Sequence, residues 1–117
     1  MVNLWIYRET SGRLAGTDLT GCKVEALDGS IGKVDKHSDE AAASYLVVDT
    51  GPWIFGKHVL LPAGTVSLVD MDEHRVHVDL TKEQIRSAPE FDKEKHLGDP
   101  EYHSTLSGYY RGMSHRA

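Results

Sequence analysis

Residues 23–36 run Lys23-Val24-Glu25-Ala26-Leu27-Asp28-Gly29-Ser30-Ile31-Gly32-Lys33-Val34-Asp35-Lys36. Two short β-type runs, 23–27 and 30–36, flank Asp28-Gly29, a pair that predicts a two-residue turn. A type I′ turn needs positive φ at both central residues, which Asp tolerates and Gly adopts without steric cost. This stretch therefore predicts a β-hairpin near the start of the core.

Four further β-type runs follow at short spacing, at residues 44–50, 53–61, 66–70 and 75–80. Gly51-Pro52 and Met71-Asp72-Glu73 supply turns between them. In the last run, apolar residues alternate with polar ones, the period of two expected of a strand with one buried face. Short, closely spaced strands must close or stack to hide their edges. We therefore expect an all-β fold, a small antiparallel barrel of about six strands.

Two helices are predicted after the strands. Thr81-Lys82-Glu83-Gln84 is a capping box that begins a short helix, which ends before Pro89. A second helix is predicted from Pro100 to Arg111, with Asp99 as its cap and Gly112 at its end. The fold is therefore a barrel followed by a short helix and a C-terminal helix.

Composition indicates one soluble domain of 117 residues with a net charge of −5. The acidic balance argues against nucleic acid as the main partner. Cys22 is the single cysteine, so an intrachain disulfide is impossible and a reducing compartment fits best. The longest apolar run near the N-terminus, residues 4–7, is too short to insert into a membrane. We expect a cytoplasmic protein.

Several fragments, in their order and spacing, resemble PRC-barrel domains: residues 19–24, 28–34, 45–49, 56–62 and 76–81, continuing to Ala88-Pro89. The family includes the cytoplasmic domain of the photosynthetic reaction-centre H subunit, the C-terminal domain of a ribosome-maturation factor and stand-alone bacterial proteins. The resemblance implies a compact barrel that docks onto other macromolecules and has no common catalytic centre. It divides the chain into an N-terminal arm (1–18), a PRC-barrel domain (19–91) and a C-terminal helical tail (92–117).

The sequence predicts no metal site, no cofactor and no catalytic residues. His74 and His77 are the closest histidine pair, but residues three apart on a strand point to opposite faces. The acidic run 70–73 lacks the further oxygen ligands and the glycine of a calcium-binding loop. No nucleophile motif frames Ser44, Ser67 or Cys22, so we expect no enzyme activity.

Two apolar segments are candidate partner-binding surfaces. The first is the predicted hairpin 51–57, whose large side chains either close one end of the barrel or form an exposed docking patch. The second is a stripe at helical spacing on the C-terminal helix, which packs either on its own chain or on a partner. The candidate residues are Trp53, Ile54, Phe55, Tyr102, Leu106, Tyr109 and Tyr110.

The leading hypothesis is a non-enzymatic protein-binding or self-assembly module that forms a homodimer or higher oligomer, or binds another protein. An accessory role in ribosome or RNA processing is the alternative, suggested by family analogy alone. A further alternative is small-ligand binding at the barrel mouth, with His37 and His58 as polar groups.

Overall fold

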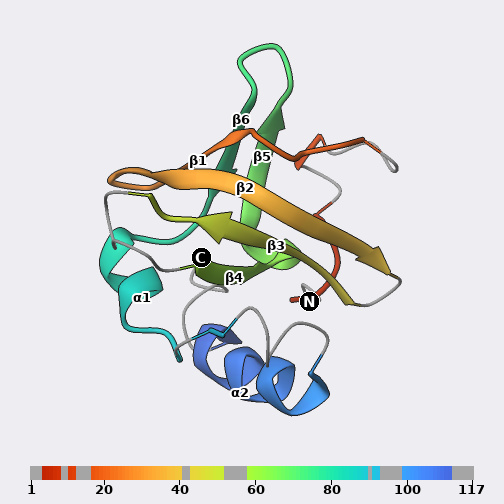
Figure 1. Cartoon of the computed structure of the whole chain (residues 1–117), viewed down its shortest axis with the longest axis vertical. Helices are drawn as coiled ribbons and strands as arrows, with labels where there is room; N and C mark the ends of the chain where they lie inside the picture. Colours follow the sequence, from red (N-terminus) through yellow and green to blue (C-terminus); the bar gives the residue numbers. More distant parts are fainter. Residues whose placement is uncertain are drawn as a thin grey trace.

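The computed structural model describes residues 4–8, 11–12, 17–40, 43–51, 58–89, 91–92 and 99–111. These residues form six strands and two α-helices (Figure 1), which confirms the predicted strand count and both helices. The elements are β1 (Lys23–Ala26), β2 (Gly29–Glu40), β3 (Ala43–Asp49), β4 (His58–Pro62), the 3-10 turn η2 (Ala63–Thr65), β5 (Val66–Asp70), β6 (Arg75–Val78), α1 (Lys82–Arg86) and α2 (Pro100–Arg111).

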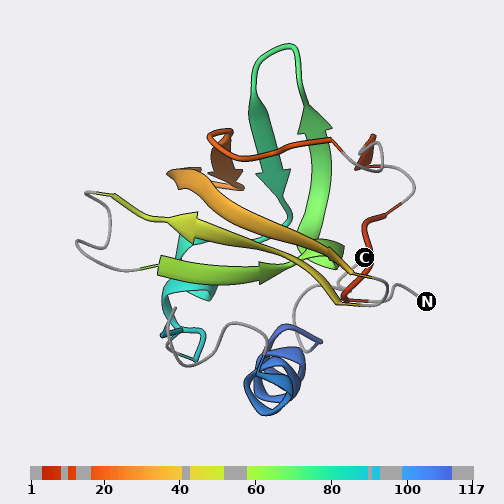
Figure 2. The same cartoon turned by 45° about the vertical axis from the view of Figure 1, so that its right-hand side comes forward.

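The strands form one mixed sheet in the order β4-β3-β2-β1-β6-β5. The pairs β1–β2, β2–β3, β3–β4 and β5–β6 are antiparallel. The pair β1–β6 is parallel, with Lys23 opposite Arg75 and Val24 opposite Val76. The prediction of a wholly antiparallel sheet is therefore wrong at this pair. Among the described residues the sheet ends at β4 and β5 and does not close, so the predicted barrel is confirmed only as a single curved six-stranded sheet. The β5–β6 hairpin stands across the direction of β2, β3 and β4 (Figure 2).

The first hairpin turns one residue earlier than its sequence predicts. Ala26 pairs with Gly29, so the turn residues are Leu27 and Asp28. Among the described non-glycine residues, His74 alone has a positive φ, which excludes the predicted type I′ turn at Asp28-Gly29. The carboxylate of Asp28 instead accepts a hydrogen bond from the backbone N–H of Lys82 over 2.9 Å. This bond ties the turn to the start of α1.

At Gly32, the backbone of β2 lies very close to the backbone at the end of β3. Its φ is +148°, and an added Cβ would overlap the carbonyl oxygen of Asp49. A bulge in the β1–β2 pairing at this level leaves Ile31 unpaired and buried. Bulges increase local twist and bend a strand. Gly32 and the bulge therefore contribute to the curvature of the sheet.

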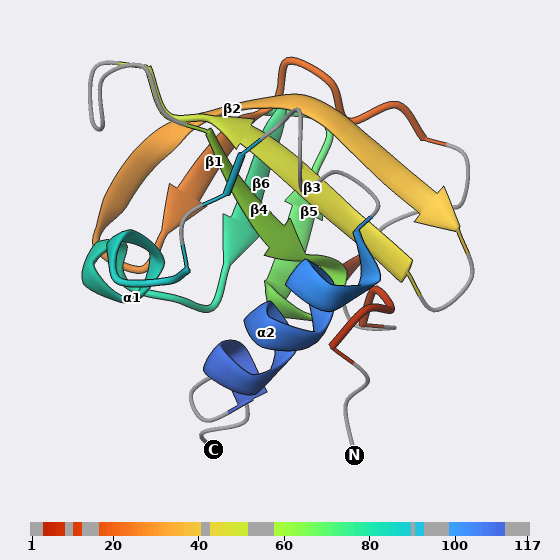
Figure 3. The ribbon, with the colours of Figure 1, turned by 60° about the horizontal axis from the view of Figure 1, so that its bottom comes forward.

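The core lies between the concave side of the sheet and the two helices (Figure 3). Alternation places Val24 and Ala26 of β1 inside, and Val76 and Val78 of β6 join them. Fully buried side chains of the centre also come from β3, β4 and the helices: Leu46, Val47, Val48, Leu61, Ile85, Leu106 and Tyr110. No helix in the described part of the chain is long and apolar enough to span a membrane.

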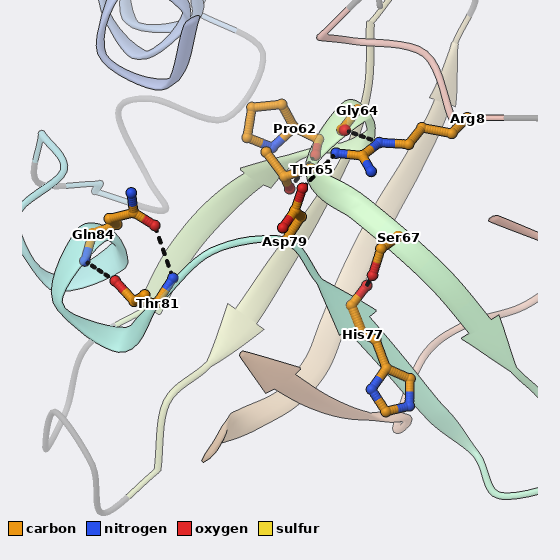
Figure 4. A network of polar contacts seen from close by, with 9 residues as sticks. All are labelled: Arg8, Pro62, Gly64, Thr65, Ser67, His77, Asp79, Thr81 and Gln84. Carbon is orange, nitrogen blue, oxygen red and sulfur yellow. Dashed lines mark hydrogen bonds and ion pairs between the residues drawn. The ribbon is translucent and has the colours of Figure 1, made fainter. Parts of the chain in front are cut away.

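Residues 4–8 join the sheet to α2. Trp5 is buried, its ring stacks on His103 at 4.7 Å between centroids, and its Nε1 donates to Ser107 Oγ over 2.6 Å. Its carbonyl accepts from the N–H of Ser44 over 3.0 Å. Arg8 Nε donates to the carbonyl of Gly64, at the η2 turn, over 2.9 Å (Figure 4). The segment therefore contacts three elements distant in sequence.

The capping box is present at the start of α1. The N–H of Gln84 donates to Thr81 Oγ1, and the N–H of Thr81 donates to Gln84 Oε1 (Figure 4). At α2, the N–H of Glu101 donates to the carboxylate of Asp99. Both predicted helix starts are therefore confirmed.

Candidate functional site

The partner-binding residues predicted from sequence fall into two groups. Trp53, Ile54 and Phe55 lie outside the described residues. The other four lie on α2, where Tyr102, Leu106 and Tyr110 are buried in the chain's own core and Tyr109 is half-buried against it: its hydroxyl donates to the carbonyl of Gln84. A partner-binding role for either group stays a prediction.

The histidines of the described residues lie at separate places. His74 is in the turn before β6 and His77 is on β6. His58 Nε2 lies 3.6 Å from the carboxylate of Asp35, and His37 Nε2 lies 3.3 Å from that of Asp18. Across the described ranges, no three His, Cys, Asp or Glu side chains gather as metal ligands.

One polar feature of the sheet is a row of residues at one level, in which each residue lies opposite the next on the neighbouring strand. Lys23 on β1 is opposite both Lys33 on β2 and Arg75 on β6. The row continues outward to acids, because Lys33 is opposite Asp49 and Arg75 is opposite Asp70. Three cations therefore occupy the middle of the sheet and are flanked by carboxylates.

The middle of this row lines a hollow of about 400 Å³, which we call the charged groove. Its walls come from β1, β2, β3, β6 and the turn after β3. The lining residues are Lys23, Glu25, Ser30, Gly32, Lys33, Asp49, Gly51 and Arg75. Because the central side chains of the row all line this groove, they lie on one face of the sheet.

Two acids line the charged groove and each has a partner. The carboxylate of Glu25 lies 3.0 Å from the Arg75 guanidinium. The carboxylate of Asp49 accepts a hydrogen bond from the N–H of Gly51 over 2.9 Å. Lys23 and Lys33 are both exposed. The groove can therefore offer two ammonium groups to a ligand, with the guanidinium of Arg75 beside them.

Strand alternation in the sequence indicates that Lys23, Glu25 and Arg75 point away from the core. It does not indicate that they are neighbours, because β1 pairs with β6, about fifty residues later in the chain. This pair is parallel, whereas the sequence predicts antiparallel strands. The sequence reasoning therefore missed the charged groove. The one signal of the groove in the sequence was that adjacent predicted strands carry lysines at positions that point away from the core.

The comparisons with known proteins bear on family more than on function. No curated protein matches the chain. Among solved structures, a 16S ribosomal RNA processing protein, RimM from Pseudomonas aeruginosa, is similar at 25% identity with a TM-score of 0.47. The match covers 56% of this chain and 42% of that one. This chain thus spans less than half of that protein, and a likeness of this degree carries no functional argument.

The family assignment rests on sequence and agrees with the fold. The family model for the PRC-barrel domain matches residues 12–85, more than half of the 117 residues. The matched region contains all six strands and most of α1, and it begins earlier than the boundary expected at residue 19. The chain belongs to the PRC-barrel domain family.

Proposed function

We propose that this protein is a non-enzymatic protein-binding module whose charged groove takes an extended, carboxylate-rich segment of a partner protein. The observation that carries the proposal is the row of three cations, Lys33, Lys23 and Arg75, on adjacent strands. Like charges directly opposite each other destabilise a sheet. An anionic partner offsets this cost, so the groove is suited to binding carboxylates.

The composition of the groove favours a protein segment over a nucleic acid. Glu25 and Asp49 line the groove beside the cations, and the chain carries a net charge of −5. Every nucleotide of a nucleic acid carries a phosphate, so a nucleic acid brings negative charge to these acids as well as to the lysines, whereas a peptide can place an uncharged residue opposite the acids. A peptide can place carboxylates at the lysines and a hydrogen-bond donor at Asp49.

A second copy of the chain is one source of such carboxylates. Asp72 and Glu73 are exposed in the turn of the β5–β6 hairpin, which projects from the body of the molecule (Figure 2). Leu68 and Met71, near the same tip, are 45% and 37% exposed. The hairpin therefore offers acidic and apolar contacts together, and self-association is part of the proposal.

The test uses a labelled ten-residue peptide of alternating Glu and Thr, with alternating Lys and Thr as the charge-reversed control. The protein should bind the acidic peptide, and the double variant Lys23→Gln with Lys33→Gln should bind it about tenfold more weakly, since each exposed charge pair contributes about 0.2–1 kcal/mol. Lys36→Gln is the matched control, because Lys36 is an exposed lysine on β2 outside the groove lining.

Two outcomes would overturn the proposal. Equal binding by the double variant and the wild type would remove the groove from the interaction. Tighter, salt-dependent binding of a ten-nucleotide RNA than of the acidic peptide would favour the nucleic-acid alternative instead. Light scattering across a range of concentrations, repeated with Asp72→Asn and Glu73→Gln, measures whether a second copy occupies the groove.

A further inference from the structure

The turn between β5 and β6 carries acids that have no ionic partner in the described part of the chain. We call residues 71–74 the acidic tip, because Asp72 and Glu73 are both exposed there. Neither carboxylate forms an ion pair with a described residue, and the same holds for the ammonium groups of Lys23 and Lys33 in the charged groove. Two acids and two lysines are therefore available to a partner.

The acidic tip and the charged groove are neighbours on the same molecule. The backbone N–H of Lys23 donates to the carbonyl of His74, the last residue of the tip, over 2.9 Å. The next residue along the chain, Arg75, lines the groove. The tip itself projects beyond the other strands (Figure 1). A negative site that can reach another molecule therefore lies beside a positive site that can receive one.

This placement favours a closed pair of molecules over an open chain. In a twofold contact both copies use the same surface, so every contact between two residues occurs twice. If the tip of one copy enters the groove of the other, a half-turn about an axis between tip and groove brings the second tip into the first groove. Complementary sites on opposite sides of a molecule would instead build a filament.

Exposed apolar side chains lie on the same hairpin. Leu68 lies opposite His77, two residues after Arg75 on β6, so Leu68 and Arg75 share the outward face of the sheet. Leu68 and Met71 are two of the four large apolar side chains that are exposed among the described residues. A protein interface surrounds an apolar centre with a polar rim. The hairpin supplies both parts, because its apolar side chains lie close to the charges of the tip.

We infer that two copies of the chain form a twofold dimer in which each acidic tip occupies the charged groove of the other copy, with Leu68 and Met71 buried between them. The dimer rests on the function proposed for the groove and adds a means of regulating it. Because both grooves are closed in the dimer, a carboxylate-rich segment of another protein has to displace the tip. Dimer formation and partner binding are therefore mutually exclusive.

The test uses light scattering on the full chain and on two charge-reversed variants. The groove variant is Lys23→Glu with Lys33→Glu, and the tip variant is Asp72→Lys with Glu73→Lys. The wild type should dimerise, and each variant alone should dimerise at least about tenfold more weakly, because like charges meet at both contacts. An equimolar mixture should recover the dimer, since one contact is then the natural pair and the other joins the reversed tip to the reversed groove.

Leu68→Ser tests the apolar part of the contact and does not depend on the charge-reversed variants. It should weaken the dimer about tenfold, because two copies of Leu68 are buried in each dimer. Ile6→Ser is the matched control, since Ile6 is exposed to the same extent, 45%, but lies on the segment 4–8 that contacts α2. It should leave the dimer unchanged. Equal effects of the two substitutions would overturn the proposed dimer.

The tip variant separates the dimer from the proposed function, because its groove is intact. It should bind the acidic Glu-Thr peptide at every protein concentration, whereas the wild type should bind it more weakly as the concentration rises and the dimer forms. A wild type that binds the peptide but stays monomeric up to about 1 mM would overturn the dimer and leave the proposed function standing. A mixture of the two variants that dimerises no better than either alone would also overturn the dimer. A tip variant that does not bind the peptide would overturn the proposed function.

Discussion

Lys23 of β1 lies directly opposite Lys33 of β2, and the next strand on the other side places Arg75 at the same level. Lys23 therefore has a cation on each side. Glu25 pairs with Arg75 at 3.0 Å and relieves part of the repulsion. The remaining positive charge is the feature on which the proposed function depends.

Because Lys23 has a cation on each side, this lysine of the charged groove should lower the stability of the folded protein. Lys23→Gln should raise the free energy of unfolding by about 0.5 kcal/mol at low salt, because it removes two like-charge neighbours. The gain should shrink at high salt, where repulsion is screened. Urea unfolding measures both values. Lys36→Gln, opposite Val47, should change little. A loss of stability in Lys23→Gln would contradict the arrangement.

Two glycines should respond in opposite ways to the same substitution. Gly32→Ala should cost about 3 kcal/mol or more, because Gly32 has a positive φ and its added Cβ would overlap the backbone of Asp49. Gly108 lies in α2 with open space around its Cβ position. Gly108→Ala should stabilise by about 0.5–1 kcal/mol. Thermal unfolding of both variants checks the pair, and a tolerated Gly32→Ala would contradict the close crossing of β2 over β3.

The contact between Trp5 and α2 should contribute measurable stability. Ser107→Ala removes the acceptor of the Trp5 Nε1 hydrogen bond and should cost about 1 kcal/mol. Thr105→Ala is the control on the same helix, because Thr105 is exposed and its hydroxyl donates to the carbonyl of Glu101, within α2 itself. Urea unfolding should separate the two. Equal effects would show that residues 4–8 do not hold α2 in solution.

Acid should destabilise the same region through His103. Burial lowers the pKa of His103 from its ordinary value of 6.5, while the charge of Asp99 opposes this effect. Below pH 6.5 the unfolded chain therefore binds a proton that the folded chain resists, so stability falls as pH falls through this range. His103→Phe, which keeps a ring against Trp5, should lose less stability between pH 7 and pH 5. Parallel pH profiles for the two proteins would contradict this.

Local signals in the sequence predicted most of the elements. Alternation at residues 75–80, the capping box at Thr81 and the Asp99-Pro100 helix start each depend on neighbours in the chain, and the structure has all three. The turn at Asp28 was misplaced because the carboxylate bonds to Lys82, more than fifty positions away. Short-range patterns carry no information about such a contact.

The candidate sites were harder to predict for the same reason. The charged groove exists because β6 returns beside β1 in the same direction, and hairpin signals describe only strands that follow each other. The helical spacing in the sequence places the tyrosines of α2 in one stripe and does not distinguish their hydroxyls from one another. Only three-dimensional packing distinguishes Tyr110, whose buried hydroxyl lacks a described partner, from Tyr102 and Tyr109, which bond to backbone carbonyls.

The proposed function is tested most directly by titrating the acidic Glu-Thr peptide into the wild type and into the Lys23→Gln, Lys33→Gln double variant, with amide resonances as the readout. We predict shifts concentrated at Lys23, Ser30, Lys33 and Arg75, which line the groove, and an affinity about tenfold lower in the double variant. Shifts elsewhere on the surface, or equal affinities in the two proteins, would contradict the account.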